Sequence, residues 1–210
     1  MTLYVQQVGG LETNCYIVAS EKNSAAIIDP GADANAIINS LETYQLAPVF
    51  ILLTHGHFDH IGAANALRSR YSIPVYANEQ DLYLLKDTTR NRARYHKVTQ
   101  EDYHVVPNHF IKEGDVLALD ELRFQILETP GHTKGGICAI CGDLLFSGDT
   151  LFLGDIGYTH FQGGSYSDME DSLRKLRDLS GDYTVLPGHG SHTTLENERQ
   201  KNKYILKLVE

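Results

Sequence analysis

The 210-residue chain has no tryptophan, only three cysteines and a deficit of positive charge, with 18 lysines and arginines against 27 aspartates and glutamates. A formal net charge of −9 is unlike the basic footprint of a general nucleic-acid binder, so we expect no nucleic-acid partner. No apolar run reaches the roughly 18 residues of a membrane span. The first residues, Met1 to Tyr4, lack the charged and apolar regions of a signal peptide, which favours a cytoplasmic protein.

The scarcity of cysteine suits a reducing compartment. Cys138 and Cys141 form a Cys-x-x-Cys pair, a spacing that also occurs in redox and zinc sites. Their surroundings have the pattern of a strand, in which residues three apart point to opposite faces. We therefore interpret both as structural, and Cys15 as part of the interior of another strand.

The length is that of one domain, and we expect residues 1–210 to form a single domain. Apolar or alternating runs predict strands at 3–8, 14–19, 25–29, 49–53, 74–77, 116–119, 122–128, 137–141, 144–147 and 183–186. Helical spacing predicts helices after a cap at Asp33 and at 58–70, 79–86, 168–179 and 194–208.

Metal-binding side chains are densest between Thr54 and His60, where three imidazoles and a carboxylate follow a predicted buried strand and open a helix. Alternate residues of an extended segment point to the same side, so His55 and His57 can reach one metal ion. Asp59 and His60 fall on the first helical turn and face a second point nearby. Imidazole and carboxylate together suit zinc, iron or manganese.

Three further metal-binding side chains follow strands later in the chain. His132 comes after the turn residues Pro130 and Gly131, and His189 lies between two glycines at the end of the last predicted strand. Asp149 also ends a strand, and its two carboxylate oxygens could bridge two metal ions. The sequence therefore indicates one site assembled from several strand ends, as open α/β sheets commonly build their sites.

The ordered set that begins with His55-x-His57-x-Asp59-His60 resembles the metallo-β-lactamase superfamily over essentially the whole chain. The stretch 194–204 is similar to the end of short glyoxalase II-like hydrolases, although Lys203 stands where a proline often follows the asparagine. The resemblance implies an α/β (α+β) fold, a four-layer αββα metallo-β-lactamase sandwich. Its two mixed sheets would have helices outside and the metal ligands on loops along one edge.

The resemblance also implies a site with two divalent ions, zinc in the first place and iron or manganese as alternatives. Carried over residue by residue, it gives one ion to His55, His57 and His132, a second to Asp59, His60 and His189, and a bridging position to Asp149. A metal-bridging hydroxide would be the nucleophile, and Asp59 would act as the catalytic residue that orients it and accepts its proton.

The activity implied by the resemblance is hydrolysis of a small acyl-thiol substrate, of the S-lactoylglutathione type, by a glyoxalase II-like thioesterase. A lactonase and a mononuclear iron persulfide dioxygenase of the same fold remain alternatives. A non-catalytic metal binder would not need the whole ligand set. Hydrolysis of penicillins is not expected, because His60 and Asp149 stand where the β-lactamases that use a cysteine ligand differ.

Two segments are left with open interpretations. Tyr158 and His160 lie where related proteins often have arginine and aspartate, which weakens the glutathione and dioxygenase assignments. Both are candidates for contacting a different thiol carrier, or they merely pack or face solvent. Residues 87–101 carry several cations and form either a solvated segment or a substrate-facing lid. His96, His104 and His109 lack a partner at ligand spacing and are not assigned to metal.

Overall fold

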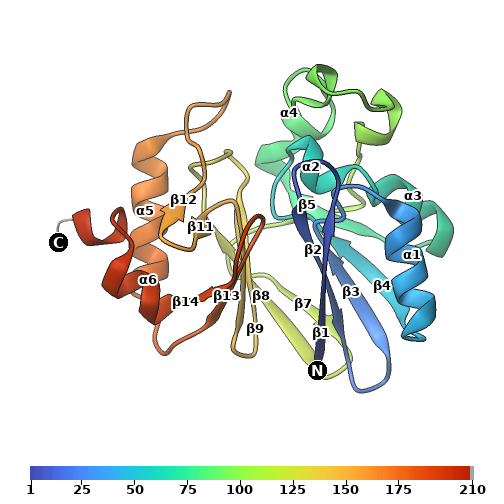
Figure 1. The fold of residues 1–210 in the computed structure, drawn as a ribbon, viewed down its shortest axis with the longest axis horizontal. Coiled ribbons are helices and arrows are strands. Elements are labelled where there is room, and N and C mark those ends of the chain that lie inside the picture. The colour runs from blue at the N-terminus through green and yellow to red at the C-terminus, as the bar shows by residue number, and fades with distance from the viewer. Residues whose placement is uncertain (209–210) are drawn as a thin grey trace.

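The computed structural model describes residues 1–208, apart from the side chains of Gln100 and Glu101; residues 209 and 210, the end of the expected domain, lie outside it. Two six-stranded sheets face each other at the centre of the molecule, and helices cover their outer sides (Figure 1). This arrangement is the four-layer αββα sandwich that the resemblance implied.

The first sheet has the order β1-β2-β3-β4-β5-β6, antiparallel from β1 to β3 and parallel from β3 to β6. Its strands are β1 (Thr2–Val8), β2 (Thr13–Ala19), β3 (Ser24–Ile28), β4 (Ala47–Leu52), β5 (Val75–Asn78) and β6 (His109–Ile111). Helices α1 (Ala34–Thr43) and α3 (Ala64–Tyr71) lie on its outer face (Figure 1). The short strand β6 was not predicted, because two of its three residues are exposed and give it no apolar pattern.

The second sheet has the order β14-β13-β10-β9-β8-β7, in which only β10 and β13 are parallel neighbours. Its strands are β7 (Val116–Leu119), β8 (Leu122–Glu128), β9 (Ile137–Cys141), β10 (Leu144–Gly148), β13 (Thr184–Pro187) and β14 (Thr193–Thr194). Helices α5 (Tyr166–Arg177) and α6 (Leu195–Lys201) cover its outer face, and a small hairpin joins β11 (Leu151–Phe152) to β12 (Asp155–Ile156) (Figure 1).

The inner faces of the two sheets form one apolar core. Phe50 from the first sheet meets Phe124 from the second with ring centroids 5.7 Å apart and nearly perpendicular planes. Cys141 belongs to this core, whereas Cys138 belongs to the cluster beneath the outer helices α5 and α6. The two thiols therefore point to opposite faces of β9, as expected, and both are free. Burial raises the pKa of Cys138 to about 11, which suits a structural thiol.

The single helix predicted over residues 58–70 is wrong. The chain forms a short helix α2 (Phe58–Ile61) and then α3, because two amide groups leave the helical pattern. The amides of Gly62 and Ala63 donate to the carbonyls of Gly31 and Pro30, at 3.0 and 2.8 Å. These bonds to the turn after β3 separate α2 from α3 and fix the position of α2.

Three other predicted helix features differ from the structure. The terminal helix stops at Lys201, where Asn202 turns to an extended conformation, and a 3-10 turn follows at Ile205–Lys207. Asp33 precedes α1 without capping it, since its carboxylate accepts from the Gly9 amide at 2.8 Å. The helix predicted over 79–86 is a 3-10 turn at Glu79–Asp81 followed by α4 (Leu82–Leu85).

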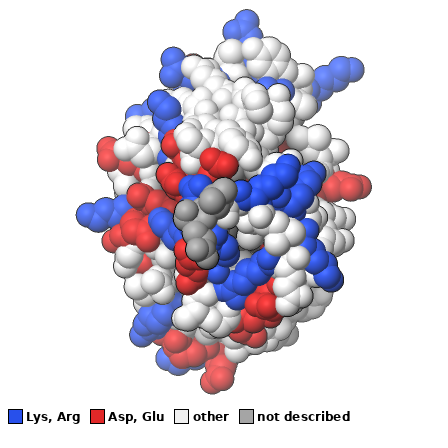
Figure 2. Space-filling view, turned by 90° about the vertical axis from the view of Figure 1, so that its left-hand side faces the viewer, with Lys and Arg blue, Asp and Glu red and all other residues white. Residues whose placement is uncertain are grey.

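Charged side chains of both signs are interspersed on the face that carries α5 and α6 (Figure 2). Several make close pairs, such as Arg174 with Asp171 at 2.7 Å and Arg199 with Glu196 at 3.4 Å. Within residues 1–208, no helix has the length and apolar character needed to cross a membrane.

Candidate metal centre and active site

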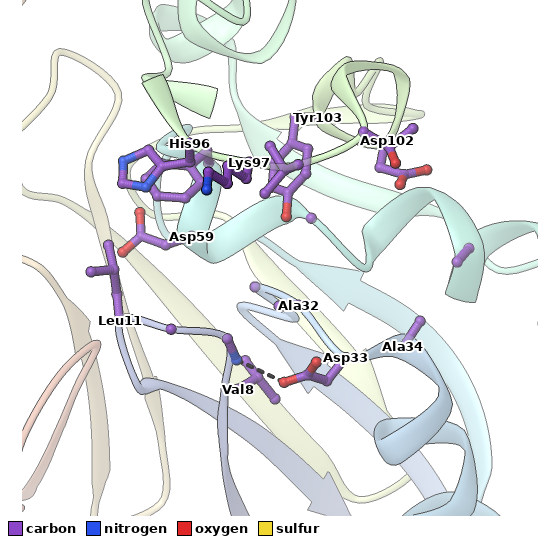
Figure 3. A pocket seen from close by; sticks show the side chains of 18 residues that line it. Val8, Leu11, Ala32, Asp33, Ala34, Asp59, His96, Lys97, Asp102 and Tyr103 are labelled. Carbon is purple, nitrogen blue, oxygen red and sulfur yellow. Dashed lines mark hydrogen bonds between the residues drawn. The ribbon is translucent and has the colours of Figure 1, made fainter. Parts of the chain in front are cut away.

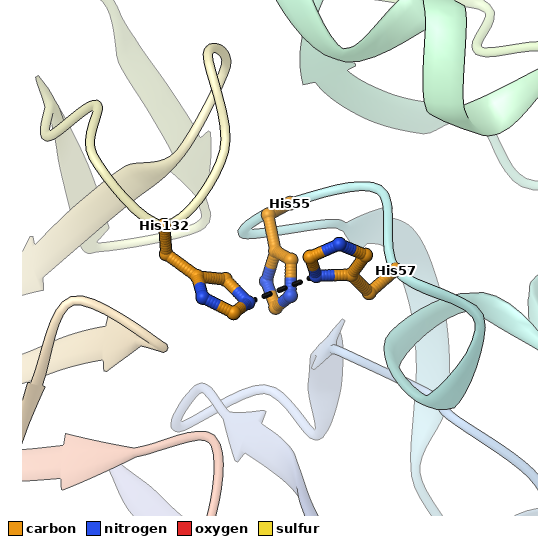
Figure 4. A group of neighbouring side chains, drawn as sticks. All are labelled: His55, His57 and His132. Carbon is orange, nitrogen blue, oxygen red and sulfur yellow. Dashed lines mark hydrogen bonds between the residues drawn. The ribbon is translucent and has the colours of Figure 1, made fainter. Parts of the chain in front are cut away.

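The predicted metal-binding side chains converge at one edge of the sandwich, on the loops that follow β4, β8, β10 and β13. His55 and His57 come from the loop between β4 and α2, and His132 comes from the loop after β8 (Figure 4). Each of these three buried imidazoles offers a nitrogen within 4.8 Å of the others. The closest pair is His57 Nδ1 and His132 Nε2, which are 2.8 Å apart.

A second group lies beside the first. Asp59 and His60 from α2 meet His189 from the end of β13, again with ligand atoms within 4.8 Å of one another. The Nε2 atoms of His60 and His189 are 3.3 Å apart. The Asp59 Oδ2 atom lies 3.1 Å from His189 Nε2. Helix α2 therefore supplies two members of this group from consecutive positions.

Asp149 connects the two groups. Its Oδ2 atom lies 3.4 Å from His132 Nε2 in the first group, and its Oδ1 atom lies 3.4 Å from His60 Nε2 in the second. The structure thus brings together all seven side chains that the sequence singled out. The division of metal-ligand roles among them stays a prediction.

Unsatisfied polar atoms indicate that this cluster is built for a cation. Among the described residues, His55 Nε2, His57 Nε2 and Asp149 Oδ1 are buried without a hydrogen-bond partner. A buried polar atom without a partner is costly, and such atoms are rare away from functional sites. Imidazole nitrogens and carboxylate oxygens are also the donors that zinc and iron accept. The side chains present therefore fit the metal ions that the fold implies.

Second-layer contacts orient the imidazoles. Asp29 Oδ2 lies 2.8 Å from His60 Nδ1, which leaves His60 Nε2 directed at the cluster. The other Asp29 oxygen accepts from the Thr54 amide at 2.7 Å. Asp29 could also be grouped with His55 and His60 as a metal-binding set, but these bonds engage both of its oxygens. We therefore assign Asp29 to positioning His60.

Backbone carbonyls do the same for two other imidazoles. His132 Nδ1 lies 2.7 Å from the Tyr158 carbonyl, and His189 Nδ1 lies 3.0 Å from the Leu11 carbonyl. Each contact directs the Nε2 atom of the ring towards the centre, so the ligand geometry depends on two loops distant in sequence.

The buried carboxylate of Asp81 joins the loops that carry the first group. It accepts from the Gly56 amide at 2.8 Å, from the Thr133 hydroxyl at 2.8 Å and from the Gly135 amide at 2.7 Å. Burial raises the pKa of Asp81, and these hydrogen bonds oppose that shift. The sequence analysis missed Asp29 and Asp81. Asp29 could have been found, since it follows β3, the parallel neighbour of the strand that precedes the histidines.

Electrostatics separate the two groups. Burial lowers the pKa of His55 well below its usual value, and nearby imidazoles lower it further, so the ring is neutral and able to bind metal. Burial also acts to lower the pKa of His60, but Asp149, Asp29 and Asp59 outweigh it and raise that pKa to about 10. The carboxylates therefore favour positive charge at this point of the cluster.

Two cavities meet at the centre. One, of about 490 Å³, lies over the imidazoles and is also lined by Arg92, Phe152, Tyr158 and Phe161. The other, of about 620 Å³, lies between the β1–β2 turn and residues 96–103. Asp59 lines both cavities, and Figure 3 shows its carboxylate at one end of the larger one. A substrate with two arms could thus place its reacting bond beside Asp59.

Tyr158 and His160 have different positions relative to the centre. Tyr158 lines the cavity over the imidazoles, although its side chain is largely exposed. His160 lines a neighbouring cavity outside it, with its ring centroid 5.0 Å from that of Tyr158. Their contact with a substrate stays a prediction.

The segment 87–101 forms one wall of the site. Arg92 and His96 line the cavity over the imidazoles, and His96 stacks on Phe58 with centroids 4.1 Å apart. These contacts favour the substrate-facing interpretation of the segment over the solvated one. The metal-binding groups found among the described residues do not include His96, His104 or His109.

Comparisons with known proteins agree with this geometry. A family model described as the metallo-beta-lactamase superfamily matches residues 8–189. The hydroxyacylglutathione hydrolase GloC of Haemophilus influenzae is 36% identical over 98% of this chain and 98% of its own. The crystal structure of the B3 metallo-beta-lactamase BLEG-1 superposes with a TM-score of 0.89 and 34% identity, covering 97% of this chain and 99% of that one.

A further solved structure is informative about metal. TTHA1623 in a di-iron-bound form superposes with a TM-score of 0.85 and 33% identity, over 96% of this chain and 99% of that one. The fold, the edge position of the His and Asp cluster and the extent of these matches have one explanation: the chain belongs to the metallo-beta-lactamase superfamily.

Proposed function

We propose that this protein is a dinuclear metal-dependent hydrolase that cleaves S-acyl-thiols of the S-lactoylglutathione type into a carboxylic acid and a thiol. The position of Asp149 is the observation that carries this proposal. Its two oxygens face His132 and His60 at equal distances of 3.4 Å, as a carboxylate shared by two ions requires. A purely structural zinc site would need only one closed set of four ligands.

In this proposal the first group, His55, His57 and His132, and the second group, Asp59, His60 and His189, each hold one ion. Zinc suits the imidazole and carboxylate donors, and iron is the first alternative because TTHA1623 was solved with iron. Manganese is the other alternative. When bound, two such ions lower the pKa of water and polarise the acyl carbonyl.

The protein side chains contribute orientation and proton transfer. Asp59 Oδ2 lies 3.5 Å from the Thr13 hydroxyl and 3.1 Å from His189 Nε2, which hold the carboxylate beside the centre. We assign Asp59 to orient the attacking water and accept its proton. A carbon–oxygen bond then forms, the carbon–sulfur bond breaks, and the proton finally resides on the released thiol or the solvent. Asp29 keeps His60 in place throughout.

The similarity to GloC, which is named a hydroxyacylglutathione hydrolase, supports the substrate class. The two cavities that meet at Asp59 would take the acyl arm and the thiol arm separately. Tyr158 and His160 are proposed to lie along the thiol arm. A β-lactam is a second candidate substrate, because the similarity to BLEG-1 is of the same order as the similarity to GloC.

Hydrolysis of S-D-lactoylglutathione by protein of measured metal content tests the proposal. We expect about two ions per chain and oxygen-independent turnover. Asp149→Ala removes the proposed bridge and should lower kcat/KM by at least about 100-fold. Asp143→Ala is the matched control, because Asp143 is an exposed aspartate in the turn between β9 and β10 and should leave turnover unchanged.

The same preparation should be assayed with a γ-lactone, a chromogenic cephalosporin and glutathione persulfide. Turnover of the lactone or the cephalosporin without the thioester would overturn the substrate class. One iron per chain with oxygen uptake on the persulfide would replace the hydrolase with a dioxygenase.

A further inference from the structure

We propose that Arg92 recognises an anionic group on the thiol carrier, at a subsite formed by Arg92, Phe161 and Tyr158 beside the metal centre. This inference rests on the proposed thioesterase function and specifies the substrate further. It assigns the carrier arm to the cavity over the imidazoles and gives that arm a negative charge.

The guanidinium group of Arg92 is placed for a ligand. Its Cζ atom lies 4.1 Å from the centroid of the Phe161 ring, so the planar group covers the face of the ring. Among the described residues, the Arg92 side chain has no hydrogen-bond or ion-pair partner. Stacking uses the face of a guanidinium and leaves its N–H donors, which lie in the plane, available for a carboxylate or a phosphate.

The backbone of Arg92 is held in an unusual conformation. Its φ of 77° lies in the left-handed region, which residues other than glycine rarely adopt. The preceding Asn91 is fully buried, and its amide donates to the Tyr103 carbonyl at 2.9 Å. The Asn91 carbonyl accepts from the Phe58 amide at 3.0 Å, at the start of α2. Arg92 is thus tied to the helix that carries Asp59 and His60.

Phe161 connects Arg92 to the other half of the site. Its ring centroid lies 5.6 Å from that of His57, 6.1 Å from that of His132 and 4.7 Å from that of Tyr158. Residues from both halves of the sandwich therefore form one wall beside the first imidazole group. A thiol released at the centre would leave along this wall.

The charge of the cavity points to an anion. Among the described residues that line it, Arg92 is the only lysine or arginine. The carboxylates of Asp59 and Asp149 face the imidazoles rather than Arg92, since each has imidazole nitrogens within 3.8 Å. A carboxylate of a peptide thiol or a phosphate of a nucleotide-containing thiol would satisfy the guanidinium equally well, because its fork matches both.

Three thioesters that share a lactoyl group distinguish these cases. S-lactoylglutathione carries carboxylates, lactoyl-coenzyme A carries phosphates, and the S-lactoyl derivative of N-acetylcysteamine is neutral. We expect Arg92→Gln to raise KM for at least one anionic thioester by about 10-fold or more with little change in kcat. The neutral thioester should be unaffected. Arg92→Lys should restore part of the loss, because it keeps the charge without the fork.

Arg94→Gln is the matched control, because Arg94 lies in the same segment but is exposed and does not line the cavity. A larger effect on the glutathione ester identifies a carboxylate, and a larger effect on the coenzyme A ester identifies a phosphate. Equal losses on all three thioesters would assign Arg92 a general structural role and overturn the inference. Unchanged kinetics on all three would also overturn it.

Binding of S-methylglutathione and of coenzyme A, measured by calorimetry, separates this inference from the thioesterase proposal. Neither probe is hydrolysed as a thioester. The wild-type protein should bind one of them about 10-fold more tightly than Arg92→Gln does, and added salt should reduce this difference. Equal binding by the two proteins would refute the role of Arg92 even if every thioester were hydrolysed. Absence of hydrolysis with intact differential binding would refute only the thioesterase.

Discussion

At the scale of single residues, His60 illustrates how a side chain is prepared for metal. Its Nδ1 atom is fixed by Asp29 at 2.8 Å, and its Nε2 atom faces both His189 and Asp149. The ring therefore has one orientation rather than several, and little conformational entropy is lost when an ion binds. Such outer contacts commonly tune metal affinity as strongly as the ligands themselves.

Replacement of Asp29 by asparagine should lower metal affinity by about 10- to 100-fold, because the amide cannot hold His60 as the carboxylate does. Asp33→Asn is the control. Asp33 has nearly the same left-handed φ, 54° against 50°, but its carboxylate accepts from the Gly9 amide outside the cluster. Competition with a chromophoric chelator measures the affinity of both variants. Equal affinities would show that Asp29 has no part in positioning His60.

At the scale of elements, the sequence predicted the features that depend on local pattern. His55 and His57 alternate on an extended segment, and His132, Asp149 and His189 each follow a strand, so their convergence at one edge was predictable. The break between α2 and α3 was not predictable, since Gly62 bonds to a carbonyl 31 residues earlier in the chain. The roles of Asp29, Asp81 and Arg92 likewise depend on contacts between distant segments.

The turn after β3 should be essential for the position of α2. A Cβ atom added to Gly31 would overlap the backbone carbonyl of Asp59, so Gly31→Ala must displace either the turn or the helix. We expect a loss of about 1–3 kcal/mol in unfolding free energy and reduced metal content, because Asp59 and His60 move with the helix.

Gly10→Ala is the control for Gly31→Ala, because a Cβ atom at Gly10 would meet nothing within 4 Å. Chemical denaturation and metal analysis of the two variants provide the measurement. Gly31→Ala protein as stable and as fully metallated as Gly10→Ala protein would contradict the tight packing of the turn against α2.

At the scale of the whole molecule, the two halves share a core and a site. Phe50 of the first sheet packs on Phe124 of the second, and both belong to the cluster between the sheets. The proposed ligands before residue 61 follow the first sheet, and those after residue 131 follow the second. Metal ions at the edge would therefore connect the two halves in addition to the core.

Metal removal should accordingly lower the stability of both halves together. An ion at 100 times its dissociation constant contributes about 2.7 kcal/mol, which for a chain of this size corresponds to roughly 5–10 °C in Tm. We expect the metal-free protein to melt that much earlier in a single transition, the same by circular dichroism and by tyrosine fluorescence. His189→Gln should lose most of the metal-dependent shift, because it removes one ligand of the second group. His104→Gln should keep the shift, since His104 is exposed and belongs to no metal-binding group among the described residues. Two separate transitions would instead mean that the sheets unfold independently, and an equal shift in both variants would remove His189 from the metal site.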